Sequence, residues 1–167
     1  MTEETYADAI ALLKADHRKV EELFDKFEEA SGKKKQAIAN QICNELKIHT
    51  IIEEEIFYPA LKGKIESETY TEAFVEHDGA KVLINDIVAG SPDDEFYAAK
   101  VKVLSEEIKH HVHEEEMRVE GMFAQARDAG VDLVALRDDM LARKTELMQE
   151  AERTGLPPAQ LKVVVAS

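Results

Sequence analysis

Apolar residues recur every three or four positions through most of the chain, which is the spacing typical of amphipathic α-helices. Glycine and proline interrupt this pattern at only a few points, and Val and Ile do not alternate with polar residues as they would in strands. The prediction is therefore an all-α chain. Its expected helices cover residues 5–30, 33–62, 69–89, about 93–129 and 133–153.

Two of these helices carry recognisable start signals. Residues 91–94, Ser-Pro-Asp-Asp, resemble an N-cap, a first-turn proline and an acidic first turn, so we expect the fourth helix to begin there. We expect that helix to continue through residues 117–129, with a bend near Gly121. Asp132 is a candidate N-cap for the fifth helix, because its carboxylate can accept a hydrogen bond from a first-turn N–H group.

Polar residues that can bind metals interrupt the apolar stripe of each of the first four helices. They are His17 on the first, His49 and Glu53 on the second, His77 on the third, and His111 and Glu115 on the fourth. Residues four apart on a helix lie on one face, so each His-x-x-x-Glu pair can point at one common spot.

The stretch 108–117 offers two such pairs, and helical position decides between them. The residues three or four positions apart that precede His111 on its helical face, at 108, 104, 101 and 97, are apolar. Those that precede His110 are Glu107, Val103 and Lys100. The inward pair is therefore predicted to be His111 and Glu115. The neighbouring groups are predicted to be solvated or to lie behind the ligands: His110, His113, Glu54, Glu55, Glu114 and Glu116.

The six inward residues form an internal repeat. Each half of the chain supplies one helix with a lone inward histidine and one with an inward His-x-x-x-Glu pair. Two such hairpins are expected to pack as an up-down four-helix bundle, and bundles build metal sites from inward side chains. We predict a single domain over residues 1–167, with the bundle at about 5–129, an additional C-terminal helix at about 132–153 and a tail at 154–167.

Charge and cysteine content limit the classes of function. The net charge of −14 argues against binding to nucleic acid or to anionic membranes. The single cysteine, Cys43, follows the apolar rhythm and is predicted to be a packed thiol. No signal peptide and no apolar run of spanning length is found, so we expect a cytoplasmic protein.

Buried carboxylates need a partner, because an unpaired charge in a protein core costs several kcal/mol. Lys81 could supply one ion pair, and a metal-free bundle with hydrogen-bonded histidines is the competing interpretation. Nitrogen and carboxylate ligands without thiolate suit iron, manganese or zinc. Six ligands are too many for one tetrahedral zinc, so two metals are expected. A ferritin-like site is disfavoured because only Glu107 and His110 have its Glu-x-x-His spacing, on the polar face.

The four motifs together resemble those of the hemerythrin-like (HHE cation-binding) domain family. His17 lies in A-D-H, His49 and Glu53 in H-T-I-I-E-E-E-I-F-Y-P, His77 in E-H-D, and His111 and Glu115 in H-H-V-H-E-E-E. The resemblance implies a non-haem di-iron centre, oxo- or hydroxo-bridged, in which these six residues bind two iron ions and Glu53 and Glu115 bridge them.

The chain also departs from the pattern of the oxygen-carrying members. These have a second histidine four residues from that of the third helix, where this chain has Ala73 or Lys81, and their last carboxylate is an aspartate in a longer spacing. A tyrosine such as Tyr6, Tyr70 or Tyr97 could complete the coordination, and reversible oxygen carriage is not expected.

The expected function is a di-iron protein that binds or turns over hydrogen peroxide, dioxygen or nitric oxide, with catalase- or peroxidase-like activity as the enzymatic form. The alternative is an iron- or oxygen-responsive sensor or binding protein without turnover. The sequence leaves the oligomeric state open.

Overall fold

The computed structural model describes residues 5–165, in which all regular structure is helical. The prediction of an all-α chain is confirmed for this part of the protein. The elements are α1 (Ala9–Glu29), α2 (Lys33–Ile52), the π-helical turn η1 (Glu53–Phe57), α3 (Tyr58–Leu61), α4 (Ser67–Ala89), α5 (Tyr97–Glu116), α6 (Met122–Asp128) and α7 (Leu133–Arg153).

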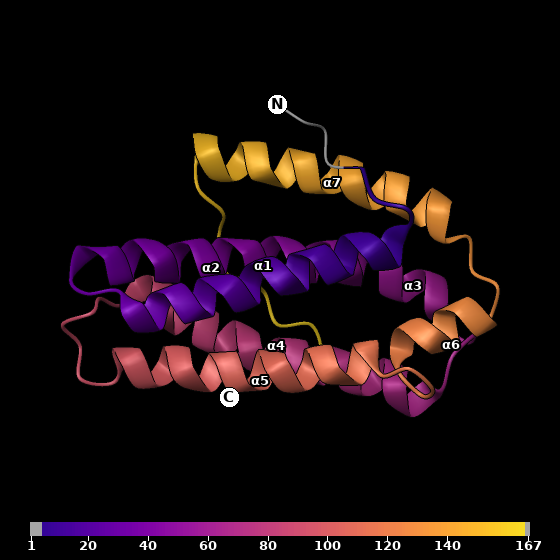
Figure 1. Cartoon of the computed structure of the whole chain (residues 1–167), viewed down its shortest axis with the longest axis horizontal. Helices are drawn as coiled ribbons and strands as arrows, with labels where there is room; N and C mark the ends of the chain where they lie inside the picture. Colours follow the sequence, from indigo (N-terminus) through magenta and orange to yellow (C-terminus); the bar gives the residue numbers. More distant parts are fainter. Residues whose placement is uncertain (1–4, 166–167) are drawn as a thin grey trace.

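The four long helices α1, α2, α4 and α5 run along the long axis of the molecule and form the predicted bundle (Figure 1). α7 is the additional C-terminal helix, and it lies over α1 and α2 on the outside of the bundle. Its N-cap is Asp132, as predicted, and the carboxylate accepts a 3.0 Å hydrogen bond from the N–H of Ala135. Every helix in the described part of the chain is too short or too polar to serve as a membrane span.

The bundle interior consists of two apolar clusters with a polar layer between them. One cluster contains the first turns of α1, such as Leu13, with Phe57 and Phe123. The other contains the second half of α1, such as Phe24, with residues of α2, α4 and α5 such as Leu104. The polar layer lies between these clusters, so its residues are held by close-packed side chains.

The start of the fourth bundle helix differs from the prediction. α5 begins at Tyr97, six residues later than the expected cap at Ser91. The Asp94 carboxylate accepts the N–H of Ser91, and the N–H of Asp94 donates to the Ser91 carbonyl. The polar side chains of this stretch therefore close a local turn, because the groups that cap helices also stabilise turns.

The predicted continuation of that helix through residues 117–129 is also wrong. α5 ends at Glu116, and α6 begins only at Met122. At Gly121 the backbone packs closely against the backbone of Met117. A Cβ atom at position 121 would lie only 2.4 Å from the Met117 carbonyl oxygen, so a side chain does not fit there. The glycine signals a break with close backbone approach, where the sequence pattern alone suggested a bend.

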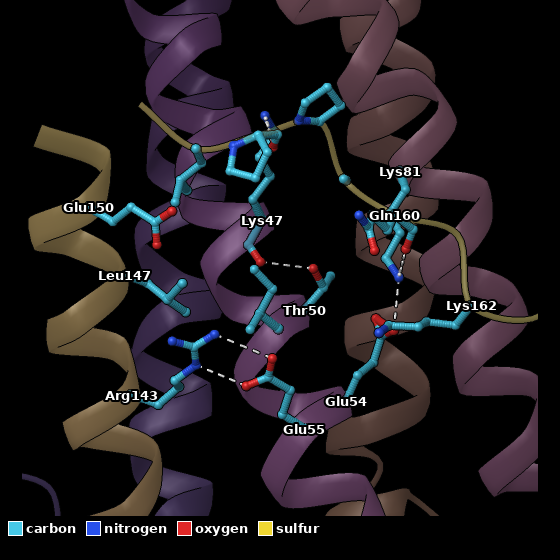
Figure 2. Close-up of a pocket in the computed structure, with 15 residues that line it drawn as sticks. Lys47, Thr50, Glu54, Glu55, Lys81, Arg143, Leu147, Glu150, Gln160 and Lys162 are labelled. Atoms are coloured by element: carbon cyan, nitrogen blue, oxygen red, sulfur yellow. Dashed lines mark hydrogen bonds and ion pairs between the residues drawn. The ribbon is translucent and has the colours of Figure 1, made fainter. Parts of the chain in front are cut away.

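The tail after α7 returns across the bundle and is tied to α4. The N–H groups of Lys162, Val163 and Val164 all donate to the buried Asp78 carboxylate, at 2.7 to 3.0 Å. Lys81 donates to the Gln160 carbonyl at 2.9 Å. Figure 2 shows this tail crossing above a cavity of about 270 Å³ between α2, α7 and α4, into which Glu54 and Glu55 also point.

We expect Asp78→Ala to release the tail and lower the free energy of unfolding by about 1–3 kcal/mol, the usual cost of losing hydrogen bonds to a buried charge. Limited proteolysis and denaturant unfolding measure the two effects. Asp86→Ala is the matched control, since Asp86 lies on the same helix but forms an exposed ion pair with Lys100. Equal protease sensitivity of the two variants would show that Asp78 does not hold the tail.

Candidate metal centre

The π-helical turn η1 sets the geometry at the second motif. The N–H of Tyr58 donates to the carbonyl of Glu53, five residues earlier, so one residue more than in an α-helix fits into this turn. Pro59 follows directly and has no N–H group to continue an α-helical ladder. As a result Tyr58 stands one turn above Glu53 on the same inward face.

The structure brings the six predicted residues together in two overlapping groups. In the first, His17, His49, Glu53 and Glu115 offer one ligand atom each, all within 4.8 Å of one another. In the second, Glu53 lies within the same distance of His77 and His111. Glu53 belongs to both groups, as expected of a bridging carboxylate. All six residues are buried, with at most 5% of each residue exposed.

The tyrosine at this site is Tyr58, which the sequence analysis did not name. Its hydroxyl lies 3.0 Å from His77 Nε2, 3.3 Å from His111 Nε2 and 3.3 Å from Glu115 Oε2, to which it donates. The predicted tyrosines lie elsewhere: Tyr6 and Tyr70 pack against one apolar cluster, and Tyr97 belongs to the other.

Each of the four inward histidines is oriented by a carboxylate at its Nδ1 atom. The pairs are His17 with Glu116 (2.7 Å), His49 with Asp16 (3.0 Å), His77 with Glu54 (2.9 Å) and His111 with Glu76 (2.9 Å). Ionised carboxylates only accept hydrogen bonds, so each Nδ1 donates and each Nε2 faces the centre. Carboxylates in this position fix the ring and raise its basicity as a metal ligand.

These carboxylates form a closed ring around the bundle. α1 supplies Asp16 to the histidine of α2, and the turn after α2 supplies Glu54 to the histidine of α4. α4 supplies Glu76 to α5, and α5 supplies Glu116 back to α1. Each of them directly precedes or follows one of the six inward residues in the sequence. Adjacent helical residues point about 100° apart, so one faces the centre and the other reaches the next helix.

Among the atoms that face the centre, the histidine nitrogens pair with the inward carboxylates, His17 and His111 with Glu115 and His49 with Glu53. His17 Nε2, His49 Nε2, both Glu53 carboxylate oxygens and Glu115 Oε1 are buried and make no geometrically acceptable hydrogen bond within the described chain. His77 Nε2 and His111 Nε2 face each other at 3.1 Å. Imidazole nitrogens and carboxylate oxygens that converge on one buried point are stabilised by a cation, so the residues present fit a metal ion.

The carboxylates at the centre raise the pKa values of His49 and His111 by more than burial lowers them. Burial lowers the pKa of His49, but Glu53 and Asp16 outweigh it and raise the pKa to about 10. Burial likewise opposes the charged form of His111, yet Glu115 raises the pKa of this imidazole well above its usual value. Both shifts report a site that attracts positive charge. A metal ion bound there displaces protons from these imidazoles.

Three of the side chains predicted to be solvated or to lie behind the ligands have partners outside the two inward groups. Glu54 and Glu116 orient histidines, and Glu55 pairs with Arg143 of α7 at 2.9 Å. Lys81 forms the expected ion pair with a buried glutamate, which is Glu54, 2.8 Å away. The lysine therefore neutralises a carboxylate behind the ligands and leaves the two inward carboxylates to the centre.

Fold and site together define a class: helical bundles with a buried histidine and glutamate cluster suited to a cation. Residues 8–123 match the family model described as "Hemerythrin HHE cation binding domain". The chain belongs to this family, which confirms the resemblance seen in its motifs. The ligand role of each of the six residues stays a prediction.

Two known proteins are similar to the chain. A crystal structure of a hemerythrin HHE cation-binding domain-containing protein from Mycobacterium kansasii superposes with a TM-score of 0.71 and 22% identity, covering 90% of this chain and 95% of that one. A Nostoc sp. protein named "DNA nickase" is 29% identical over 106 residues. That match covers 63% of this chain but only 30% of the Nostoc protein. The first similarity supports the fold.

Proposed function

We propose that the protein is a non-haem di-iron protein that binds or turns over small oxidants, namely hydrogen peroxide, dioxygen or nitric oxide. The observation that carries this proposal is the pair of ligand groups that share Glu53. Two groups with a common carboxylate suit two ions held close together, and imidazole with carboxylate suits iron. When bound, the iron pair supplies the redox chemistry.

The chain's own residues position and tune such a centre. The four carboxylates at Nδ1 keep every Nε2 atom directed inward and hold the rings in one tautomer. Glu53 and Glu115 supply negative charge where two cations would otherwise repel each other. Tyr58 places a hydroxyl beside His77 and His111, where it can bind the metal or donate a hydrogen bond to a bound oxidant.

The space beside the histidines supports a small substrate. A cavity of about 20 Å³ is lined by all four histidines and by apolar residues such as Val20, Leu46 and Ile84. A volume of this size holds roughly one water-sized molecule, so it suits a diatomic gas or a peroxide better than a larger organic substrate. The larger cavity under the tail is separated from His77 by Glu54.

The alternative is a sensor or binding protein without turnover, and the contacts of two lysines favour it. Lys144 of α7 forms a 2.6 Å ion pair with Asp16, the carboxylate that orients His49. Lys81 joins the tail to Glu54, which orients His77. A change at the centre would therefore reach the surface through α7 and the tail.

The proposal does not extend to the activity named for the Nostoc protein. The shared region covers less than a third of that protein, and the net charge of −14 opposes contact with DNA phosphates. A cytoplasmic location and the absence of nucleic-acid and membrane partners remain predictions.

Peroxide consumption distinguishes turnover from simple binding. We expect the reduced, iron-loaded protein to remove many equivalents of hydrogen peroxide per chain, and His77→Ala to abolish this because one ligand group is lost. His113→Ala is the matched control, since His113 is exposed on the same helix as His111. An oxygen electrode or a peroxide assay measures the number of equivalents of hydrogen peroxide consumed per chain. A single spectral change with one equivalent would favour the sensor.

A further inference from the structure

The carboxylate ring has one member whose outer contact differs from the rest. Asp16, Glu54 and Glu116 each contact a lysine or arginine in addition to a histidine: Lys144 at 2.6 Å, Lys81 at 2.8 Å and Arg18 at 2.6 Å. Glu76 contacts a second histidine instead, because its Oε2 lies 3.2 Å from His110 Nε2. The same nitrogen lies 3.1 Å from Glu114 Oε1.

One imidazole nitrogen that faces two carboxylates cannot satisfy both of them with its single proton. An N–H group directs its proton to one acceptor, while the two carboxylates repel each other. A divalent cation binds all three groups at once. Ligand atoms about 2.1 Å from a metal, at angles between octahedral and tetrahedral, are about 3.0–3.4 Å apart. The two separations from His110 Nε2, 3.1 and 3.2 Å, lie within this range.

The three side chains are placed by rigid elements and are open to solvent. Glu76 projects from α4 and is held in position by the 2.9 Å hydrogen bond to His111 Nδ1. His110 and Glu114 stand on successive turns of α5, and the His110 side chain is 64% exposed. Their ligand atoms all lie within 4.8 Å of one another. An ion from solution can reach this cluster without any opening of the bundle.

We propose that Glu76, His110 and Glu114 form a second, exposed site for a divalent cation, coupled to the buried centre through Glu76. One imidazole nitrogen and two carboxylate oxygens suit Zn²⁺, Mn²⁺ or Fe²⁺. The ion takes the place that lysine or arginine occupies at the other three carboxylates. This site goes beyond the proposed function, because it requires neither iron in the centre nor an oxidant.

The test is a titration of the holoprotein, purified with its buried ions in place, with Zn²⁺ in a calorimeter. We expect one further Zn²⁺ per chain, bound about tenfold or more weakly in His110→Ala and in Glu114→Gln, since loss of a ligand costs at least as much as loss of a supporting group. Mn²⁺ followed by the EPR signal of the free ion provides an independent readout. Metal analysis should find the buried ions unchanged in both variants.

His113→Ala is the matched control, because it removes an exposed histidine of the same helix that lies outside the cluster. It should bind the further Zn²⁺ like the wild type. Two outcomes would overturn the proposal: unchanged Zn²⁺ binding in His110→Ala, or no Zn²⁺ bound by the wild type beyond its buried ions. A holoprotein whose buried ions are not iron would count against the proposed function, while the difference in Zn²⁺ binding between His110→Ala and His113→Ala would still decide the surface site.

Discussion

Glu53→Ala is expected to lower the metal content of the purified protein from one ion in each of the two ligand groups to nearly none. Glu53 is the residue that both groups share, so its loss removes a ligand from each ion at once. It also removes a negative charge that lets two cations lie close together. Elemental analysis of protein purified under identical conditions measures the effect, and circular dichroism checks that the helices persist.

The neighbouring glutamates provide a graded set of controls within one turn. Glu54→Ala leaves the ligands in place but frees His77, so metal affinity should fall by about 10–100-fold. Glu55→Ala breaks only the surface pair with Arg143 and should retain full metal content. A Glu53→Ala protein that keeps both ions, or a Glu55→Ala protein that loses them, would contradict the bridging role.

Removal of the metal by a chelator is expected to lower the melting temperature by roughly 10 °C. An ion present at about 1,000 times its dissociation constant stabilises the folded state by about 4 kcal/mol, and in a chain of this size 1 kcal/mol corresponds to about 2–4 °C. Without the ion, the buried Glu53 and Glu115 carboxylates depend on the inward histidines, and Glu115 also on the Tyr58 hydroxyl, to balance their charge. Protonation of His49, whose pKa Glu53 and Asp16 raise to about 10 despite burial, offsets part of this loss.

Scanning calorimetry of the protein before chelation, after chelation and after iron is restored gives the comparison. Glu53→Ala is the control, because a variant that binds no metal should melt at the same temperature with and without the chelator. Recovery of the original melting temperature on adding iron separates loss of the ion from damage during the treatment. Equal melting temperatures for the metal-loaded and metal-free wild type would exclude a stabilising ion.

The helices and the inward face of each were predictable because the apolar rhythm is strong. That rhythm separated His111 from His110, and the structure buries the first and exposes the second. It also predicted that Cys43 is packed, and this thiol is fully buried. Helix ends were less predictable, since Ser91 and Asp94 satisfy each other in a turn when a cap was expected.

Tyr58 was missed because the sequence was interpreted with a constant helical period. The extra residue in the π-turn shifts the residues after Glu53 by about one position, so the place one turn beyond Glu53, which an α-helix would give to Phe57, is taken by Tyr58. Pro59 was the available signal. A proline that follows a metal motif can be accommodated by a widened turn, in which the residues after the motif no longer keep the α-helical period.

The orienting carboxylates were only partly predictable. Glu54 and Glu116 were expected to lie outside the ligand set, but nothing in a single helix shows which histidine they reach. Those contacts depend on which helices are neighbours, and neighbours are fixed by packing. The same holds for Lys144, whose partner Asp16 is far away in the sequence.

In the carboxylate ring, a substitution on one helix affects the orientation of a histidine on the neighbouring helix. Replacing Asp16 on α1 loosens a histidine on α2, and replacing Glu116 on α5 loosens one on α1. A defect in one helix is thus detected in its neighbour, and a compensating change should be sought there. Because the ring is closed, the orientation of the four histidines depends on the cyclic order of the four helices around the bundle. It does not depend on which of these helices comes first in the chain.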